Sequence, residues 1–316
     1  MKIKACLSAL LFIAFLPKSF AQALITTTLP DSISHWEQTN SVGLDINEIA
    51  FVNWSVGGNN SVTLLGKGNF TRKYTKKNVN WLNELIVRYG HNSQQGQVPR
   101  KTDDQFQFNS TFGYKHDTIS NFYYSAKFNF NTQFANGYNY PNKEHVISAP
   151  FAPAYIFLGI GSEYVRKDWG FNAYFSPLTD KTTLVLNQYL ADNGAFGVEK
   201  AVRDADGNII IHGKKSRTEL GILFTNQLKR QIFKNIMLDN RLTLYTDYLN
   251  SFGNVDVNWQ FNIDMTVNQY VKANIGANVI YDDDIKATEE RDGQVVTVGP
   301  KMQLKQMLGV GLSYTF

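Results

Sequence analysis

The sequence predicts an all-β fold: a transmembrane antiparallel up-and-down β-barrel of about 12 strands, preceded by a signal peptide. Three observations support this prediction. Apolar and polar residues alternate over runs of ten or more residues, the second face of these runs is rich in Asn, Gln, Thr and charged residues, and long and short connections alternate along the chain. Tilted strands of about 9–11 residues span a bilayer, whereas the strands of soluble sandwiches, the alternative fold, average about five or six residues.

The composition excludes several other classes of protein. The 316 residues include 14% aromatic residues and only 8 Pro, which is unlike a disordered chain. Beyond the amino terminus, no run of about 18 apolar residues predicts a membrane-spanning helix. The net charge is +4, and three of these positive charges would leave with Lys2, Lys4 and Lys18 of a leader. The charge therefore indicates no nucleic-acid partner.

Residues 1–21 predict a secretory signal peptide, with cleavage after residue 21 or 23. Lys2 and Lys4 supply the positive charge, residues 5–16 form an apolar core, and small residues follow at the spacing of a cleavage site. The apolar core is too short for the alternative, an inner-membrane anchor. Because the only cysteine, Cys6, lies in the leader, the mature chain would have neither disulfides nor thiolate ligands.

Residues 24–40 predict a periplasmic lead-in with little periodicity, and residues 41–316 predict the outer-membrane barrel domain. The alternation places the barrel strands near residues 42–51, 62–71, 81–89, 105–114, 122–134, 154–164, 171–175, 220–228, 236–248, 255–267, 274–281 and 308–316.

The last of these stretches has a strict period of two. Leu308, Val310, Leu312, Tyr314 and Phe316 share one face, and glycine, serine and threonine occupy the other. Such a strand is typical of the closing strand of an outer-membrane barrel. Tyr314 and Phe316 are therefore the predicted membrane-assembly signal, with the barrel-assembly machinery as its partner.

The connections predict the strand number and the orientation. Long loops at 91–103, 135–152 and 282–300 would lie outside the cell, and short turns near 72–79, 116–121, 165–169, 229–235 and 268–272 would be periplasmic. Strands counted from the two ends of the chain alternate consistently between external loops and periplasmic turns only if residues 170–216 supply one strand. This gives twelve strands and two periplasmic termini. Residues 176–215 then form the largest external loop. The apolar run 183–190 inside it leaves open an additional strand or a folded-in segment, so 10 or 14 strands are alternatives.

Aromatic residues recur near the expected strand ends, as they do at the two interfaces of a membrane. We therefore expect outer-membrane lipid and lipopolysaccharide to surround the barrel. The residues concerned are Tyr89, Tyr114, Phe134, Tyr164, Tyr248, Tyr281 and Tyr314.

Charged residues fall on the face opposite the apolar one, where they would point into the lumen, because charge near the middle of the lipid face is costly. They would line a pore for small polar solutes, or pair across the lumen and plug it. The candidates for selectivity are Arg88, Lys127, Glu163, Glu219, Arg241 and Asp264.

Two groups of residues suggest other chemistry. Asp282, Asp283 and Asp284, at an outer strand end, offer oxygen ligands for Ca²⁺, although a solvated turn is the simpler interpretation; no other cofactor is predicted. His91 or His145 beside a serine or aspartate would suit an outer-membrane hydrolase. No nucleophile motif accompanies them, so no catalytic residue is predicted and the chain is not expected to be an enzyme.

Several short motifs, in this order, resemble the family catalogued as domain of unknown function 3078, a group of outer-membrane β-barrels of Bacteroidetes-type bacteria. The resemblance extends from about residue 36 to the end of the chain and implies the location and the fold, but no activity. The motifs are Phe51-Val-Asn-Trp54, Gly57-Gly-Asn-Asn-Ser61, Lys101-Thr-Asp-Asp104, Phe128-Asn-Phe-Asn-Thr-Gln-Phe134, Pro150-Phe-Ala-Pro-Ala-Tyr155, Ser176-Pro-Leu-Thr179, Gly194-Ala-Phe-Gly197, Tyr281-Asp-Asp-Asp-Ile285 and Leu308-Gly-Val-Gly311.

Three functions follow from these observations. A small-solute channel or porin-like transporter requires the fewest assumptions, because the predicted lumen is polar and of mixed charge. A structural or binding protein of the outer surface, with a plugged barrel, is the alternative. An outer-membrane hydrolase is the third.

Overall fold

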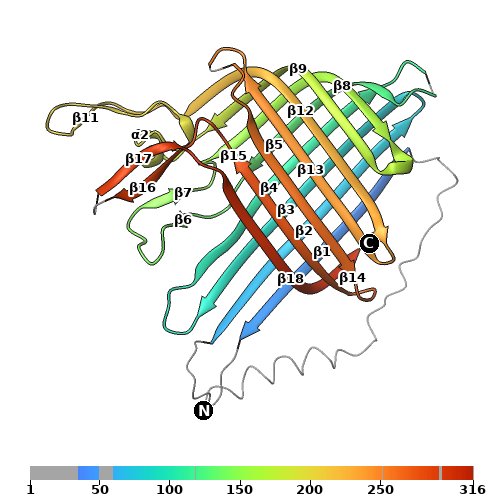
Figure 1. Cartoon of the computed structure of the whole chain (residues 1–316), viewed down its shortest axis with the longest axis horizontal. Helices are drawn as coiled ribbons and strands as arrows, with labels where there is room; N and C mark the ends of the chain where they lie inside the picture. Colours follow the sequence, from blue (N-terminus) through green and yellow to red (C-terminus); the bar gives the residue numbers. More distant parts are fainter. Residues whose placement is uncertain (1–34, 50–59, 118, 251, 292–293, 316) are drawn as a thin grey trace, which may run out of the picture. The chain divides into compact units, whose positions relative to one another are not determined.

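The computed structural model describes residues 35–49, 60–117, 119–250, 252–291 and 294–315, and most of these residues lie in β-strands (Figure 1). Twelve strands form a closed barrel in the order β1-β18-β15-β14-β13-β12-β9-β8-β5-β4-β3-β2, and all the pairs are antiparallel. The predicted fold class and strand number are confirmed. The barrel strands are β1 (Trp36–Ile49), β2 (Ser61–Lys76), β3 (Val79–Gln94), β4 (Arg100–Tyr114), β5 (Phe122–Thr132), β8 (Ala154–Arg166), β9 (Phe171–Leu184), β12 (Ser216–Phe233), β13 (Ile236–Asp247), β14 (Asp256–Thr266), β15 (Val271–Tyr281) and β18 (Gln303–Thr315).

The connections differ between the two ends of the barrel. The turn end carries the short connections 77–78, 115–121, 167–170, 234–235 and 267–270, one of which holds the 3₁₀-helix η1 (Lys167–Trp169). The loop end carries the longer connections 133–153, 185–215 and 282–302 (Figure 1). They contain the hairpins β6 (Gly137–Tyr138) with β7 (Val146–Ser148), β10 (Val202–Arg203) with β11 (Ile209–Ile211) and β16 (Lys286–Arg291) with β17 (Gln294–Pro300), the helix α2 (Gln188–Asp192) and the 3₁₀-helix η2 (Ala195–Gly197).

The seventh barrel strand is longer than predicted. The sequence predicted a loop from Ser176 onward, but β9 continues to Leu184. Its pairing with both β8 and β12 shifts by one residue near Ser176, which marks a β-bulge. Pro177 is tolerated there because proline has no N–H to donate to a neighbouring strand. This shift interrupts the period of two, so the apolar–polar alternation of the sequence does not reveal the rest of the strand. The apolar run 183–190 completes β9 and enters α2, so it adds no barrel strand.

The first strand also begins earlier than predicted. β1 starts at Trp36, inside the range 24–40 assigned to a lead-in, and pairs with β2 from its first residue. The outward-facing Gln38 and Asn40 separate Trp36 from the apolar residues that begin at Val42, so the apolar alternation starts later than the strand itself. In the same way, β3 and β4 continue through most of the predicted loop 91–103, which is reduced to residues 95–99.

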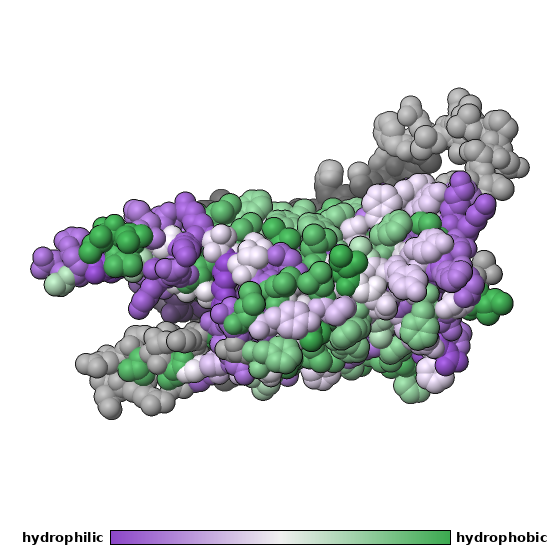
Figure 2. Space-filling view, turned by 90° about the horizontal axis from the view of Figure 1, so that it is seen from above, coloured by the Kyte–Doolittle hydropathy of each residue, from purple (hydrophilic) through white to green (hydrophobic). Residues whose placement is uncertain are grey.

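The outer surface of the barrel carries the apolar residues. Leu308, Val310, Leu312 and Tyr314 of β18 are all more than half exposed, as predicted for the outward face of the closing strand. On the face of the barrel in view, Figure 2 shows an apolar band across the middle of the wall with polar residues toward both ends.

Aromatic rings cluster where this band meets the turn end. The Trp36 ring lies 5.2 Å from that of Tyr74 and 5.8 Å from that of Trp81, and Phe122 lies 5.0 Å from Tyr164. Such rings suit a boundary between hydrocarbon and water. Among the described residues, no helix has the length and apolar character needed to cross a membrane.

Candidate functional site

The candidate functional site is the lumen, where five of the six charged residues predicted from the sequence form ion pairs. Lys127 Nζ lies 2.9 Å from Glu163 and sits 4.5 Å from the centre of the Tyr174 ring. Glu219 lies 3.1 Å from Arg217. In the described part of the chain, Asp264 forms no ion pair within 4 Å. The other two candidates, Arg88 and Arg241, make the contacts described next.

Arg241 joins opposite walls of the barrel. Its guanidinium donates two hydrogen bonds of 3.1 and 3.0 Å to Asp239 on its own strand, β13. Its Nη1 atom also lies 3.4 Å from Glu84 Oε2 on β3, which stands six strands away in the ring of twelve. We call this contact the cross-lumen bridge. It narrows the lumen, because side chains from opposite walls meet there.

The other end of the bridge is held by amides. Glu84 accepts hydrogen bonds from Asn69 Nδ2 at 3.1 Å and from Asn109 Nδ2 at 3.2 Å. A chain of side-chain amides continues along β4 toward the loop end, because Gln105 donates to Gln107 at 2.8 Å and Gln107 donates to Asn109 at 3.2 Å. These three β4 residues form a hydrogen-bonded track, which we call the amide track, that leads to the bridge.

A cavity of about 380 Å³ lies in the lumen on the loop-end side of the bridge. Gln105, the first residue of the amide track, lines it, and so do Gln260 and Asn262, which pair with Arg241 and Asp239 in the register of β13 with β14. The predicted luminal residue Arg88 also lines this cavity. Its Nη2 atom lies 2.8 Å from Asp103 Oδ2 and 3.1 Å from Met307 Sδ.

The opposite side of the barrel interior is filled by apolar and aromatic side chains. Tyr174, Leu223 and Tyr245 are buried there and pack with Phe157. These residues come from β8, β9, β12 and β13. The polar space is therefore bounded mainly by the other strands, β3, β4, β5, β14, β15 and β18, and the barrel does not enclose a uniformly wide pore at this level.

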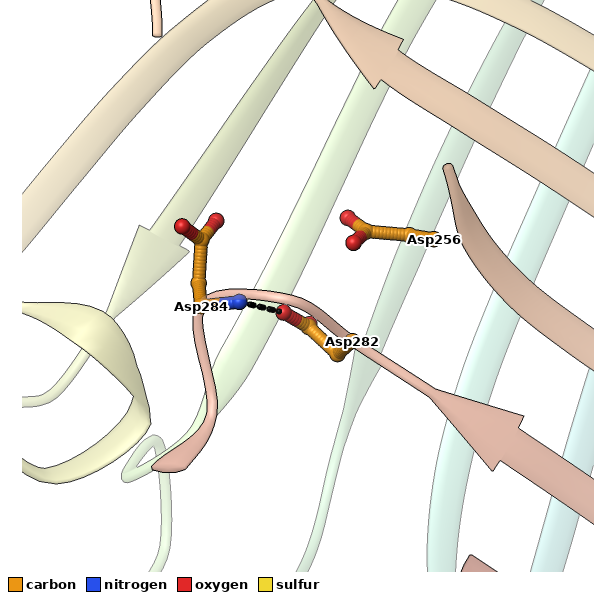
Figure 3. Close-up of side chains that lie close together, drawn as sticks. All are labelled: Asp256, Asp282 and Asp284. Atoms are coloured by element: carbon orange, nitrogen blue, oxygen red, sulfur yellow. Dashed lines mark hydrogen bonds between the residues drawn. The ribbon is translucent and has the colours of Figure 1, made fainter. Parts of the chain in front are cut away.

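A cluster of carboxylates lies at the loop end of β14 and β15. Ligand atoms of Asp256, Asp282 and Asp284 all lie within 4.8 Å of one another, and the three side chains come from two adjacent segments (Figure 3). We call these residues the acidic cluster. Burial raises the pKa of Asp282, and the neighbouring Asp256 raises it further, whereas Lys181 opposes both effects.

Two cations already neutralise part of the acidic cluster. Lys181 Nζ lies 2.6 Å from Asp256, 3.5 Å from Glu219 and 3.8 Å from Asp282. Arg217 Nη2 lies 2.8 Å from Asp284. The cluster can therefore be held together without a metal ion, because ammonium and guanidinium groups occupy the positions next to its oxygens.

The sequence predicted a different trio of aspartates. Asp282 and Asp284 do come together, but Asp283 turns away and accepts hydrogen bonds from Asn254 at 2.6 Å and Tyr281 at 3.3 Å. Residues 282–285 form a turn, in which Ile285 N–H donates to the carbonyl of Asp282 at 3.2 Å, and within this turn Asp283 points away from its two neighbours. The third member, Asp256, was not among the candidates.

The loop 185–215 folds over this end of the barrel around a small core of its own. Val185, Leu190, Ala191 and Val198 are buried together with Ala149 and Ala152 of the loop 133–153. Arg217 Nη1 donates to the carbonyl of Gly197 at 3.5 Å. The segment 194–197 is thereby held at the cavity, which Phe196 lines.

Asp192, at the end of α2, holds this loop together. Its carboxylate accepts hydrogen bonds from Gly213 N–H at 2.8 Å and Gln188 Nε2 at 2.8 Å, and it lies 3.0 Å from His212 Nδ1. Burial raises the pKa of Asp192, but these hydrogen bonds outweigh burial and hold the pKa below its usual value.

The remaining predicted residues make fewer contacts. His91 stacks on Tyr89, and His145 stacks on Tyr189. In the residues the structure describes, neither histidine has a hydrogen bond to a serine or a carboxylate, as a hydrolase would require. Tyr314 is exposed on the outer face of β18, and Phe316 lies outside the described residues. The leader, residues 1–21, lies outside them as well.

Sequence reasoning missed Lys181, Asp256 and Lys305. Lys181 follows the register slip at Ser176, so the period of two cannot assign it to the lumen without that slip. Asp256 and Lys305 lie at the loop-end edges of β14 and β18, where a charged residue is as compatible with a loop as with the lumen. Asp256 already falls on the polar face of the predicted strand 255–267, whereas Lys305 is reached only when the predicted strand 308–316 is extended by three residues.

The comparisons with known proteins concern the family and the fold. Residues 46–138 match the model of a family described as "Protein of unknown function (DUF3078)", which confirms the resemblance for the motifs in that range. The motifs from Pro150 onward lie outside the match. No curated protein matches the chain.

Several solved structures are similar to the chain. One is an outer-membrane channel from Pseudomonas putida F1, with 10% identity, 90% of this chain and 99% of that chain covered, and a TM-score of 0.41. Others are the translocator domain of the autotransporter NalP from Neisseria meningitidis, with 12% identity, 89% and 87% covered and a TM-score of 0.35, and the porin NanC, with 9% identity, 87% and 98% covered and a TM-score of 0.36.

Proposed function

We propose that the chain is an outer-membrane barrel with both termini in the periplasm, and that its lumen passes small polar solutes. The apolar band on the barrel wall supports the location, because lipid covers such a surface at little cost. The short turns at one end and the long loops at the other match the usual periplasmic and external ends. Lipid, lipopolysaccharide and the barrel-assembly machinery are the partners that this location implies.

The observation that carries the solute function is the arrangement of polar groups along the lumen. The cavity, the amide track and the cross-lumen bridge follow one another from the loop end inward. A solute can exchange its hydrogen bonds with water for hydrogen bonds with amides along this route. The bridge is then the constriction, and its single 3.4 Å contact between Arg241 and Glu84 is the link that must open.

Single-channel recording of the refolded mature chain in planar bilayers tests this function. We expect discrete conductance steps that are small for a barrel of twelve strands, because the bridge narrows the path and apolar side chains fill the other side. The absence of steps from correctly folded, heat-modifiable protein would contradict a channel.

The bridge also supports the second candidate, a closed barrel whose external loops bind partners at the cell surface. Its contact joins opposite walls, and the loop 185–215 has a packed core that a binding surface would need. Removal of the bridge distinguishes the two candidates. A channel gains conductance when the bridge is removed, whereas a barrel closed along its whole length does not.

A further inference from the structure

Side-chain amides are the most frequent polar groups among the 17 residues that line the luminal cavity. An amide group both donates and accepts hydrogen bonds, as a sugar hydroxyl does, so a wall of amides can satisfy a polyhydroxylated molecule in many orientations. Six amide side chains contribute to the lining: Gln105, Asn131, Gln133, Gln260, Asn262 and Asn278.

The charged groups of this cavity are already paired. Asp103 lies 2.8 Å from both Arg88 and Lys305. Asp104 lies 2.9 Å from Lys101 and accepts hydrogen bonds from the backbone N–H groups of residues 134 and 135. A charged solute would have to displace one of these partners, whereas an uncharged solute would not.

Two amide oxygens of the lining have no partner. Asn131 Oδ1 and Asn278 Oδ1 are buried without a hydrogen bond among the described residues, and such groups are uncommon because each one costs free energy. Asn131 lies on β5 and Asn278 on β15, six strands apart in the ring of twelve, so the two oxygens belong to opposite walls. Both residues line the cavity, so a ligand with several hydroxyl groups can meet an amide side chain on each wall.

An aromatic side chain completes the lining. Phe196 belongs to the motif Gly194-Ala-Phe-Gly197 and has φ 58° and ψ 28°, the left-handed region that a bulky residue seldom adopts. Its side chain packs against the loop core, which holds it in this conformation, and the residue lines the cavity. Backbone strain of this kind persists where surrounding structure enforces it, often at ligand sites. A flat apolar ring beside amides suits the apolar face of a sugar ring.

We infer that this cavity binds an uncharged polyhydroxylated solute, a mono- or disaccharide. The inference names the solute class for the lumen and rests on the proposed function for how the solute reaches the site. The volume of about 380 Å³ lies near the lower end of the roughly 300–1,000 Å³ of ligand pockets, which agrees with a ligand of this size.

Binding and transport are measured separately. Saturation-transfer NMR of the folded full-length mature chain in detergent reports binding of glucose, glucuronate and glucosamine, which share a sugar ring and differ in charge. We expect saturable binding of glucose that is about tenfold tighter than that of either charged sugar. Equal binding of all three, or no glucose binding, would overturn the inference even if the protein conducts ions. Glucose binding without conductance would overturn the channel and leave the sugar site standing.

Two substitutions test the site itself. Asn131→Leu and Asn278→Leu keep the side-chain size and remove the hydrogen-bonding groups, so each should weaken glucose binding about tenfold, the effect of a lost hydrogen bond. Asn274→Leu is the control, because Asn274 lies on the same strand and the same face as Asn278 but does not line the cavity. Unchanged binding in both test variants, or an equal loss in the control, would contradict the assignment.

Discussion

The cross-lumen bridge makes the sharpest prediction, which concerns Glu84→Ala. The substitution removes the carboxylate that meets Arg241 from the opposite wall. Arg241 is not left alone, because Asp239 on its own strand still accepts two hydrogen bonds from it. The barrel should therefore fold, and the side chain of Arg241 should stay on its own wall and leave the path open.

The free energy of the contact follows from the surroundings of Glu84 and Arg241. At about 4 Å and an effective dielectric constant of about 20, an ion pair has a Coulomb energy of about 4 kcal/mol. Water reaches part of both side chains, which are 19% and 26% exposed, and each keeps its other partners when the link breaks. The net contribution is then nearer 1.5 kcal/mol, roughly the lower value for a hydrogen bond to a charged group. This corresponds to about a tenfold change in the ratio of closed to open lumen.

Single-channel recording measures that ratio as open probability, with Asp45→Ala as the matched control. Asp45 is also a luminal carboxylate, but its partner Lys67, at 2.9 Å, lies on the neighbouring strand, so its loss opens no link across the lumen. We expect about a tenfold increase in time-averaged conductance for Glu84→Ala and little change for the control. Equal conductance of wild type and Glu84→Ala, with both folded, would refute the assignment of the bridge as the constriction.

Three further predictions concern the loop end and the outer wall. In calorimetric titrations, Ca²⁺ should give no heat with wild type, because Lys181 already neutralises the acidic cluster. The variant Lys181→Met should bind Ca²⁺ with a Kd of roughly 10⁻⁴–10⁻³ M. Binding of Ca²⁺ to wild type with a comparable Kd would contradict this prediction. Since the pKa of Asp192 is held below its usual value, its support of the loop should be complete above about pH 4 and be lost as the pH falls through the lowered pKa. Hydrogen exchange of the α2 amides should show this acid sensitivity in wild type and, in Asp192→Asn, weaker protection without it; identical pH profiles would refute the role of Asp192. Leu308→Arg, on the lipid face, should destabilise the barrel in lipid by about 2–4 kcal/mol in urea unfolding, and a change below about 0.5 kcal/mol would place Leu308 outside the bilayer.

The barrel was predictable because its main determinant is local. An alternation of apolar and polar residues decides which face of each strand meets lipid, and neither distant contacts nor loops alter that choice. The same alternation placed Arg88, Lys127 and Arg241 on the inner wall. It failed where a local irregularity changes the phase, as at Ser176, and where polar residues such as Gln38 occupy the outer face near a strand end.

The partners of the luminal charges were not predictable in the same way. Glu84 and Arg241 are 157 residues apart, and their contact depends on which strands stand opposite each other after closure. That arrangement requires the full strand order and the register of every pair. The acidic cluster likewise needs β14 beside β15, which brings Asp256 to Asp282. Sequence alternation gives the direction of a side chain but not its partner across the barrel.

The pairing of the luminal charges bears on which solutes the lumen favours. Arg88, Lys127 and Arg241 each have a carboxylate partner, so a passing ion meets groups whose charge is already compensated and gains little to replace its lost hydration. An uncharged solute exchanges hydrogen bonds with water for similar ones with the amide track, at little net cost. Uncharged solutes should therefore permeate well relative to ions, and a small conductance would be compatible with efficient solute transport. Liposome swelling with uncharged sugars is for this reason a more direct measure of the lumen than current alone.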